Sequence, residues 1–444
     1  MLILFYLLIS ILILIVSSTK FKLHPFFALI ISSIVFGFLA GIPTAELIIT
    51  INKGFGDTLG SIGLIIILGS VIGKFLEKTG GAIVLADNIL KLTNNKAISL
   101  TMALVGYVVS IPVFADSGFI ILSSLKKSLA AKAKISVLGP TIALSVGLLA
   151  SHSMLPPTPG PVAATGIIGA NLGLVILFGM PISLFGVLCA WFFVEKMNKK
   201  VYISPGEIEK DSKIISDEVK PSLLKAVLPI LIPIALIVLK TIAVLPSFPF
   251  GKSLFYDVAT LLGEPFSALL IGLFFALLLP SNFKFDYWSS KGWVGQAIYD
   301  AAIVLLITGA GGAFGKVLQS SPISEIITEK FLIEENGIWL PFLIAAALKS
   351  AQGSSTVAII TTASLIAPLT PALGLNSEFG LALTVSAIGA GSVVVSHAND
   401  SFFWVVVQMS GLNISEGYKY QSTGTGILGA SAMLLIFILS LFLI

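Results

Sequence analysis

The sequence predicts an all-α polytopic membrane protein built from two inverted repeats. Each repeat would hold about five transmembrane helices and one re-entrant hairpin, with broken helices at the midplane of the bilayer. Three observations support this prediction. The composition is too apolar for a water-exposed surface, the apolar stretches are spaced as transmembrane helices, and the two halves of the chain carry similar motifs in the same order.

The composition defines the class of protein. Of the 444 residues, 56% are hydrophobic and 11% are charged, and the mean hydropathy is +1.04. Soluble chains carry about 25% charged residues, so most of this surface must face lipid. The net charge of +4 gives no reason to expect a nucleic-acid partner. The single cysteine, Cys189, excludes an internal disulfide and a Cys-based metal site, and we expect neither metal nor cofactor.

All 26 basic residues are Lys, because the sequence contains no Arg. The bidentate clamp that Arg offers to a carboxylate is therefore missing. An anionic small molecule would have to be held by Lys, by hydroxyl and amide groups, or by the N-termini of helices.

A transmembrane helix needs about 20 mostly apolar residues. Uninterrupted candidates lie at residues 2–18, 24–42, 58–76, 177–195, 223–245, 258–280, 295–318 and 423–443. Four more apolar stretches, 97–125, 136–175, 338–370 and 379–410, are interrupted by Pro, Gly or polar residues. The first stretch has neither a basic region before it nor an Ala-x-Ala-type cleavage site after it, so we expect an uncleaved helix.

The two halves share short motifs roughly 240 residues apart. Residues 24–29 resemble 264–269, and 68–74 resemble 310–316. Likewise, Ser151-His152 resembles Ser396-His397, and residues 169–171 resemble 411–413. Shared composition is the alternative explanation. Internal duplication, often with inverted halves, is typical of secondary transporters.

The distribution of Lys predicts the orientation. If residues 97–125 form a hairpin, the Lys residues of 78–96 and 126–134 share one side with the Lys-rich segment 196–222. The positive-inside rule places that side in the cytoplasm. Each half then crosses the membrane an odd number of times, so both termini face the periplasm. We expect a first repeat at 1–198, a cytoplasmic linker at 199–222 and an inverted second repeat at 223–444, in the inner membrane.

Irregular backbone at membrane depth is tolerated only where protein shelters it or where it lines a wet cavity. The four interruptions therefore predict the transport pathway. The first is the hairpin tip at residues 111–118, where Asp116 is an ionisable group in an apolar run and the adjacent Ser117 is a candidate to bind substrate. Asp116 is a candidate proton carrier. The alternative is a helix cap or a carboxylate at a wet mouth.

The second interruption, residues 151–161, holds four prolines and cannot continue a helix. We expect the half-helix after it to present free N–H groups to a carboxylate near Gly160. Thr158 and Thr165 add hydroxyl groups. His152 is either a proton carrier or a structural hydrogen-bonding group.

The third interruption, residues 349–356, is the tip of the second hairpin. Its hydroxyl groups, on Ser354, Ser355 and Thr356, suit a polyhydroxylated substrate. Lys349 is the best single candidate to hold a substrate carboxylate. The alternative is that its side chain extends to the membrane interface.

The fourth interruption, residues 391–404, brings His397, Asn399 and Asp400 together in sequence. A His397–Asp400 pair could exchange a proton, or Asp400 could fix the tautomer of His397. Asn399 would bind substrate hydroxyl groups.

These interruptions resemble those of the gluconate permease family of proton-coupled sugar-acid importers, within a larger grouping of ion transporters. The similar segments are GFGDTLGS (54–61), LPPTPGP (155–161), GAGGAF (309–314), GSSTVA (353–358) and SVVVSHAND (392–400). They cover essentially the whole chain in order. The resemblance implies two inverted repeats and uptake of gluconate or a related hydroxy acid with protons. The family often has Glu at the position of Asp116 and Arg at that of Lys349, and some relatives carry D-serine, so the substrate stays open.

We therefore expect a small carboxylate as substrate, the lipid bilayer as surroundings, and H⁺ rather than Na⁺ as the coupling ion. A homo-oligomer is compatible with the sequence. The alternatives are a sodium-coupled organic-anion transporter and, from another class, an anion channel. A membrane enzyme is the weakest alternative, because neither a His-Glu-x-x-His nor a Gly-x-Ser-x-Gly motif is present.

Overall fold

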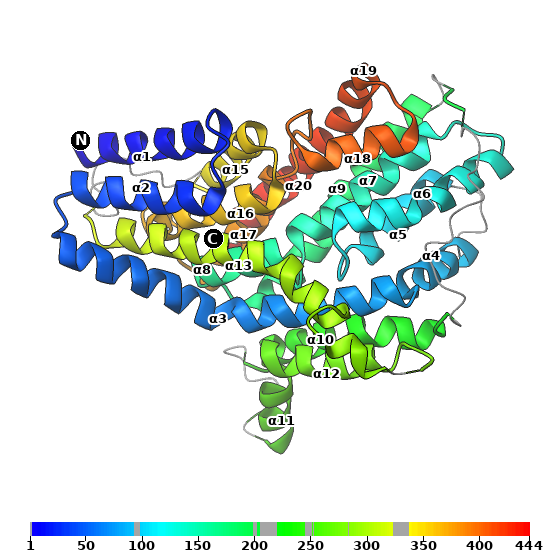
Figure 1. Ribbon diagram of the computed structural model, residues 1–444, viewed down its shortest axis with the longest axis horizontal. Helices are drawn as coiled ribbons and strands as arrows, with labels where there is room; N and C mark the ends of the chain where they lie inside the picture. Colours follow the sequence, from blue (N-terminus) through cyan, green and yellow to red (C-terminus); the bar gives the residue numbers. More distant parts are fainter. Residues whose placement is uncertain are drawn as a thin grey trace.

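The computed structural model describes residues 2–92, 98–198, 202–204, 220–244, 251, 253–282, 284–322 and 337–444. These residues form helices and loops without a strand, which confirms the all-α prediction (Figure 1). Six of the described helical segments are long and apolar enough to cross a membrane, or seven if one bent pair counts as a single span.

The first three helices form a layer with a helix from the second half. They are α1 (Leu2–Thr19), α2 (Pro25–Leu39) and α3 (Thr44–Lys78), and the helix from the second half is α13 (Trp293–Gln319). Helices α2 and α3 contact α13, and α1 packs on α2. Figure 1 shows these four side by side. Helix α3 is longer than the predicted span 58–76, because the charged residues in its first turns lowered the hydropathy without ending the helix. At the crossing with α13, a Cβ on Gly54 would lie 2.6 Å from the Cβ of Lys316, so only glycine fits.

The first predicted hairpin is present as a helix pair, α5 (Ile98–Val109) and α6 (Ala115–Lys132), with its break in the predicted segment. A helix that was not predicted, α4 (Gly81–Leu92), precedes it. The hairpin packs on a broken span, α7 (Leu138–Met154) and α8 (Pro159–Ile168), which α9 (Leu172–Asn198) follows. The predicted linker at 199–222 lies mostly outside the described residues.

The second half begins with α10 (Leu223–Ala243), and next come α11 (Leu254–Leu262) and α12 (Pro265–Leu277). The stretch 258–280, which showed no interruption in the sequence, is bent, because α11 and α12 meet at an angle of 71°. Gly263 ends α11, and the fixed backbone of Pro265 begins α12, so the two apolar runs do not share an axis. A short turn, η1 (Phe285–Trp288), leads into α13.

The last part of the chain supplies the second helix pair and the second broken span. The pair is α15 (Trp339–Gln352) and α16 (Ser355–Ile366), continued by η2 (Ala367–Leu369). The broken span consists of α17 (Glu378–Gly391) and α18 (Ser401–Ser410). The chain then forms α19 (Ile414–Glu416), the π-helical η3 (Gly417–Ser422) and α20 (Thr423–Leu443).

The two halves end their broken spans in the same way. Both α8 and α18 stop at a glycine in the left-handed region, Gly169 with φ 78° and Gly411 with φ 66°. An asparagine follows each, and Asn171 and Asn413 each accept backbone N–H bonds at the start of the next segment. This parallel favours internal duplication, while the inverted orientation of the halves and their boundaries stay predictions.

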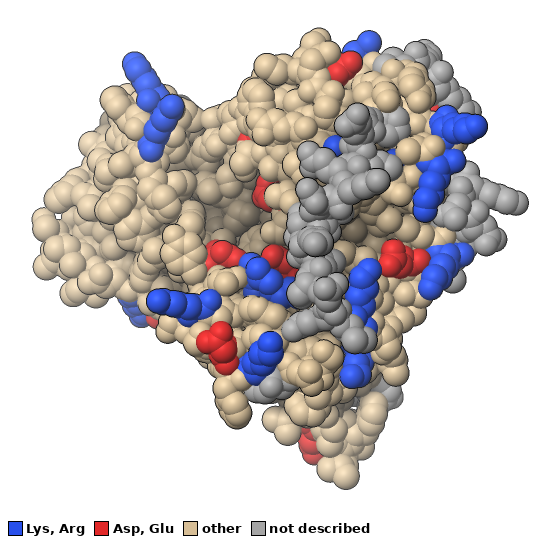
Figure 2. Space-filling model, turned by 45° about the vertical axis from the view of Figure 1, so that its right-hand side comes forward, with Lys and Arg blue, Asp and Glu red and all other residues tan. Residues whose placement is uncertain are grey.

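The broken spans form the centre of the molecule. In an apolar 18-residue stretch of the span Leu138–Ile168, 94% is buried inside the protein, against 28% in the corresponding stretch of Ile414–Leu443. Large apolar side chains are exposed on the outer helices instead, including Phe27 of α2, Leu254 of α11 and Phe274 of α12. Figure 2 shows a surface that is uncharged over most of its area. An apolar exterior around a core that holds the backbone breaks is the arrangement expected of a lipid-embedded protein.

Candidate functional site

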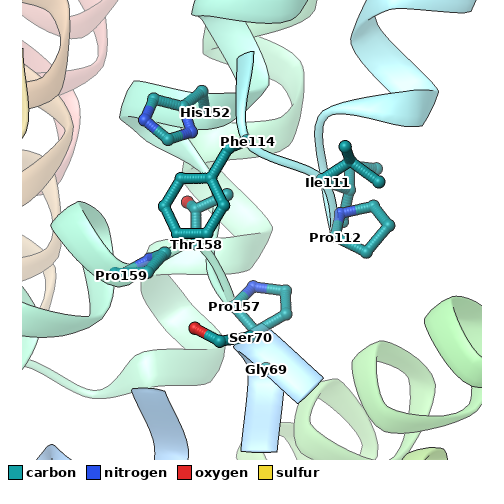
Figure 3. A pocket seen from close by; sticks show the side chains of 10 residues that line it. Gly69, Ser70, Ile111, Pro112, Phe114, His152, Pro157, Thr158 and Pro159 are labelled. Atoms are coloured by element: carbon teal, nitrogen blue, oxygen red, sulfur yellow. The ribbon is translucent and has the colours of Figure 1, made fainter. Parts of the chain in front are cut away.

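The first and second interruptions meet at a narrow pocket. The tip between α5 and α6 brings Phe114 to His152 at the end of α7, with ring centroids 5.9 Å apart. Helix α3 passes beneath, and a Cβ on Gly73 would lie only 1.9 Å from the carbonyl oxygen of Pro112. Figure 3 shows His152 on one side of this pocket and Ser70 of α3 on the other. The hairpin therefore depends on the absence of a side chain on α3.

Two polar atoms at this pocket have no hydrogen-bond partner among the described residues. They are Nδ1 of His152 and Oγ of Ser70. A buried polar atom without a partner costs about 1–3 kcal/mol. The pocket has room for about one water molecule, which is a group that could bind such an atom.

The N-terminus of α8 has fewer free backbone N–H groups than the sequence indicated. Pro159 and Pro161 have no N–H, and the N–H of Val162 bonds to the carbonyl of Thr158 at 3.2 Å. Gly160 is the one residue of this first turn with an N–H left to donate. The prediction of several free N–H groups here is therefore wrong, because the prolines that break the helix also remove its donors.

The two threonine hydroxyl groups near α8 are already donors within the chain. Thr158 donates to the carbonyl of Leu155, and Thr165 donates to that of Pro161 at 2.7 Å. Both side chains are buried. They have oxygen lone pairs left for a ligand, but no free proton in this conformation.

The third and fourth interruptions meet at a buried ion pair. Nζ of Lys349 lies 2.6 Å from Oδ2 of Asp400, and the side chains are 1% and 5% exposed. Lys349 also donates to the carbonyl of Gly353 at 2.6 Å. Asp400 accepts from Oγ of Ser396 at 2.7 Å and from the N–H of Phe402 at 3.0 Å, so it caps α18. Lys349 points inward rather than extending to the membrane interface.

His397 and Asn399 bind the backbone of α15 instead of Asp400. Nε2 of His397 lies 3.0 Å from the carbonyl oxygen of Ser350, and Nδ2 of Asn399 donates to the same oxygen at 2.7 Å. The expected side-chain pair of His397 and Asp400 is therefore not formed, because Lys349 occupies the carboxylate. The sequence alone could not show that Asp400 pairs with Lys349, which is 51 residues away, rather than with His397, which is three positions away.

The hydroxyl groups of the second hairpin tip divide into bound and available ones. Ser354 accepts from the N–H of Val357 at 3.3 Å as the cap of α16, and buried Ser355 donates to the carbonyl of Ser392 at 2.9 Å. Thr356, like Ser117 on the first hairpin, is only partly buried.

All four interruptions come together. A Cβ on Gly160 would lie 3.8 Å from the Cα of Thr356, which joins the second to the third. Asp116 is close enough to Lys349 and Asp400 for their charges to interact, which joins the first to the fourth. Asp116 and Asn399 are exposed, unlike the ion pair beside them. Figure 2 shows a hollow in the surface with an acidic side chain on its wall.

Sequence reasoning missed Lys126, which it assigned to the cytoplasmic Lys cluster. The structure buries this side chain completely between α6, α7 and α18. A signal was present in the sequence. Asp116, Phe119, Ser123 and Lys126 follow one another at helical spacing, so they share one face of α6.

Comparison with known proteins identifies the family. The family described as GntP family permease matches residues 2–442. The chain belongs to the GntP permease family. It is 33% identical to the gluconate permease of Pseudomonas aeruginosa over 98% of this chain and 97% of that one. It is 32% identical to the D-serine transporter DsdX of Escherichia coli, with the same two coverages.

The fold of this GntP permease is similar to that of a solved transporter. The YdaH transporter of Alcanivorax borkumensis, whose structure is described as having an unusual topology, aligns with a TM-score of 0.58. The alignment covers 91% of this chain and 90% of that one, at 14% identity. Membership of a permease family makes this a multi-pass membrane protein with a small-molecule substrate. Among the described residues, no group of three or more His, Cys, Asp or Glu is placed to hold a metal ion.

Proposed function

We propose that this GntP permease imports a small hydroxy acid, with gluconate as the first candidate, together with protons across the inner membrane. The observation that carries the proposal is the meeting of four backbone breaks around the buried Lys349–Asp400 pair, with exposed Asp116 beside it. Broken helices around a central site are typical of secondary transporters. An open anion channel would need a continuous wet pore instead.

The ion pair supplies a coupling mechanism. Lys349 is the cation at the meeting point, and Asp400 already neutralises it. A substrate carboxylate entering beside Asp116 and Asp400 would add a third negative charge next to a buried ion pair, which is costly. A proton delivered to Asp400 neutralises its carboxylate and so breaks the ion pair with Lys349. The ammonium then binds the substrate carboxylate, so substrate and proton travel together.

The remaining groups are assigned to the substrate and the proton path. Asn399, Thr356 and Ser117 are accessible enough to bind substrate hydroxyl groups, with the N–H of Gly160 as a further donor. Asp116, which is exposed, receives the proton from water and passes it toward Asp400. His152, whose Nδ1 lacks a partner among the described residues, is the second carrier candidate, and His397 is a positioning group for the tip of α15.

D-serine is the second candidate substrate, because DsdX is as similar to this chain as the gluconate transporters are. A D-amino acid brings its own ammonium group, which could pair with Asp116 directly. Gluconate lacks that cation and needs Lys349. Loss of Lys349 should therefore impair gluconate uptake more than D-serine uptake.

Uptake into proteoliposomes tests the proposal. Labelled gluconate, D-serine and glycerate are offered at a fixed proton gradient, with and without sodium. We expect saturable, sodium-independent accumulation of one of them against its concentration gradient, and no accumulation when an ionophore collapses the proton gradient. Accumulation that requires sodium would refute proton coupling, and non-saturable downhill flux would indicate a channel.

A further inference from the structure

Lys126 in α6 is a buried cation that the proposed mechanism does not use. Its side chain is 0% exposed. Nζ donates to Oγ1 of Thr141 at 3.2 Å and to Oγ of Ser410, and it lies 4.3 Å from the ring centroid of Phe119. No carboxylate among the described residues forms an ion pair with it. A charged group buried in a membrane protein is costly and by default functional.

Lys126 lies at one end of a parallel helix pair. Helices α6 and α18 pack against each other, and their contacts run in the same order along both chains. From the site outward, the contacts are Phe119 with Phe402, Ser123 with Met409, and Lys126 with Ser410. Asp116 and Asp400, at the inner end of the same two helices, are close enough for their charges to interact. A helix rises about 1.5 Å per residue, so Lys126 is about 15 Å from Asp116. The register of α6 against α18 that allows Lys126 to contact Ser410 therefore also sets the relative position of Asp116 and Asp400.

Helix α18 has an ammonium group at each end. Its N-terminal cap, Asp400, pairs with Lys349, and its last residue, Ser410, accepts from Lys126. The C-terminal end of a helix carries a partial negative charge, which stabilises a nearby cation. The ring face of Phe119 adds a cation–π contact. These neutral partners compensate the charge of Lys126 only while α6 and α18 stay in this register.

We propose that Lys126 is a positioning residue that holds α6 and α18 in one register and thereby sets the spacing of Asp116 and Asp400. A slip between the helices would strand the ammonium without its oxygen partners, at the cost of a buried unpaired charge. Helices α6 and α18 consequently move as one body during transport. This inference rests on the proposed function for its effect on coupling, but the helix register is a separate physical claim.

Two measurements on the full-length protein in proteoliposomes separate these claims. The first is the disulfide cross-linking rate between Ser123→Cys and Met409→Cys in a Cys189→Ser background, which needs no substrate. The second is proton-driven uptake of whichever of gluconate, D-serine and glycerate the parent protein accumulates. Lys126→Met keeps the length of the side chain and removes its charge. Lys127→Met, one position along the same helix, is the matched control.

We expect Lys126→Met to slow both cross-linking and uphill uptake about ten-fold or more, because Thr141 and Ser410 lose their shared donor. Ser410→Ala, which keeps the cation, should change both in the same direction by less. Lys127→Met should leave both unchanged. Unaltered cross-linking in Lys126→Met and Ser410→Ala would overturn the proposal, whatever happens to uptake. Normal cross-linking in a parent protein that takes up none of the acids would instead count against the proposed function.

Discussion

The Lys349–Asp400 pair gives the sharpest prediction. Each partner is nearly inaccessible, and each has two or more bonds to the other and to neighbouring groups. Removing one partner of a buried ion pair typically costs about 3–5 kcal/mol, because the other charge stays buried without compensation. We therefore expect Lys349→Met and Asp400→Asn each to lower the free energy of unfolding by about that amount.

The double variant should behave differently in stability and in transport. With both charges removed, no uncompensated charge remains, and replacing a buried pair by neutral groups is often close to neutral. We expect Lys349→Met/Asp400→Asn to recover most of the stability that either single change removes. Transport should stay at least about a hundred-fold below the parent, because the carboxylate site and the proton acceptor are both missing.

The assay is a double-mutant cycle. Denaturant unfolding of the four proteins in one detergent gives the stability arm, and proton-driven uptake gives the transport arm. Additive stability losses would show that the two charges do not interact. Restored uptake in the double variant would show that the pair is structural only, and the coupling mechanism would be wrong.

Three further predictions concern neighbouring residues. Asp116→Asn should abolish uphill accumulation while counterflow of preloaded substrate persists; proton-driven accumulation at the parent level would remove Asp116 from the coupling scheme. Gly353→Ala should lower thermal stability and uptake together, since its φ is +82° and a Cβ would lie 2.1 Å from the carbonyl oxygen of Asn399; a fully stable, active variant would mean that the tip shifts freely. Ser70→Ala should leave the free energy of unfolding unchanged or raise it by about 1 kcal/mol, because the buried hydroxyl of Ser70 has no partner among the described residues. A large drop in the thermal unfolding temperature would contradict this.

The positions of the backbone breaks could be predicted because the residues that cause them are local. Pro112, the prolines of 156–161 and the polar run 396–400 cannot continue an apolar helix, and each break lies where the sequence placed it. The bend before Pro265 had an equally local cause in Gly263 and Pro265. It was overlooked because both flanks are apolar, and a hydropathy average does not register a change of direction.

The partners of the charged residues could not be predicted, because they are set by packing between distant segments. Asp400 had a His three residues away in the sequence, and the fold gives it Lys349 instead. Lys126 stands in a Lys-rich stretch and looked like its neighbours, yet α18, almost 300 positions further on, encloses it. The helical spacing from Asp116 to Lys126 marked a face of α6, but nothing in the sequence named what that face would meet.

The two buried lysines differ in how strongly their charges act on a ligand at the central site. About 15 Å separates the ends of α18, so the charge of Lys126 acts only weakly on a ligand beside Asp400, whereas Lys349 acts at contact distance. Under the proposed mechanism, the central site then holds Lys349, Asp400 and Asp116, with a net charge of −1 before substrate enters. An incoming carboxylate would bring this to −2, and the chain has no Arg to offset it. The proposed mechanism therefore requires at least one positive charge to enter with the substrate, and the exposed carboxylate of Asp116 is where a proton can be taken up.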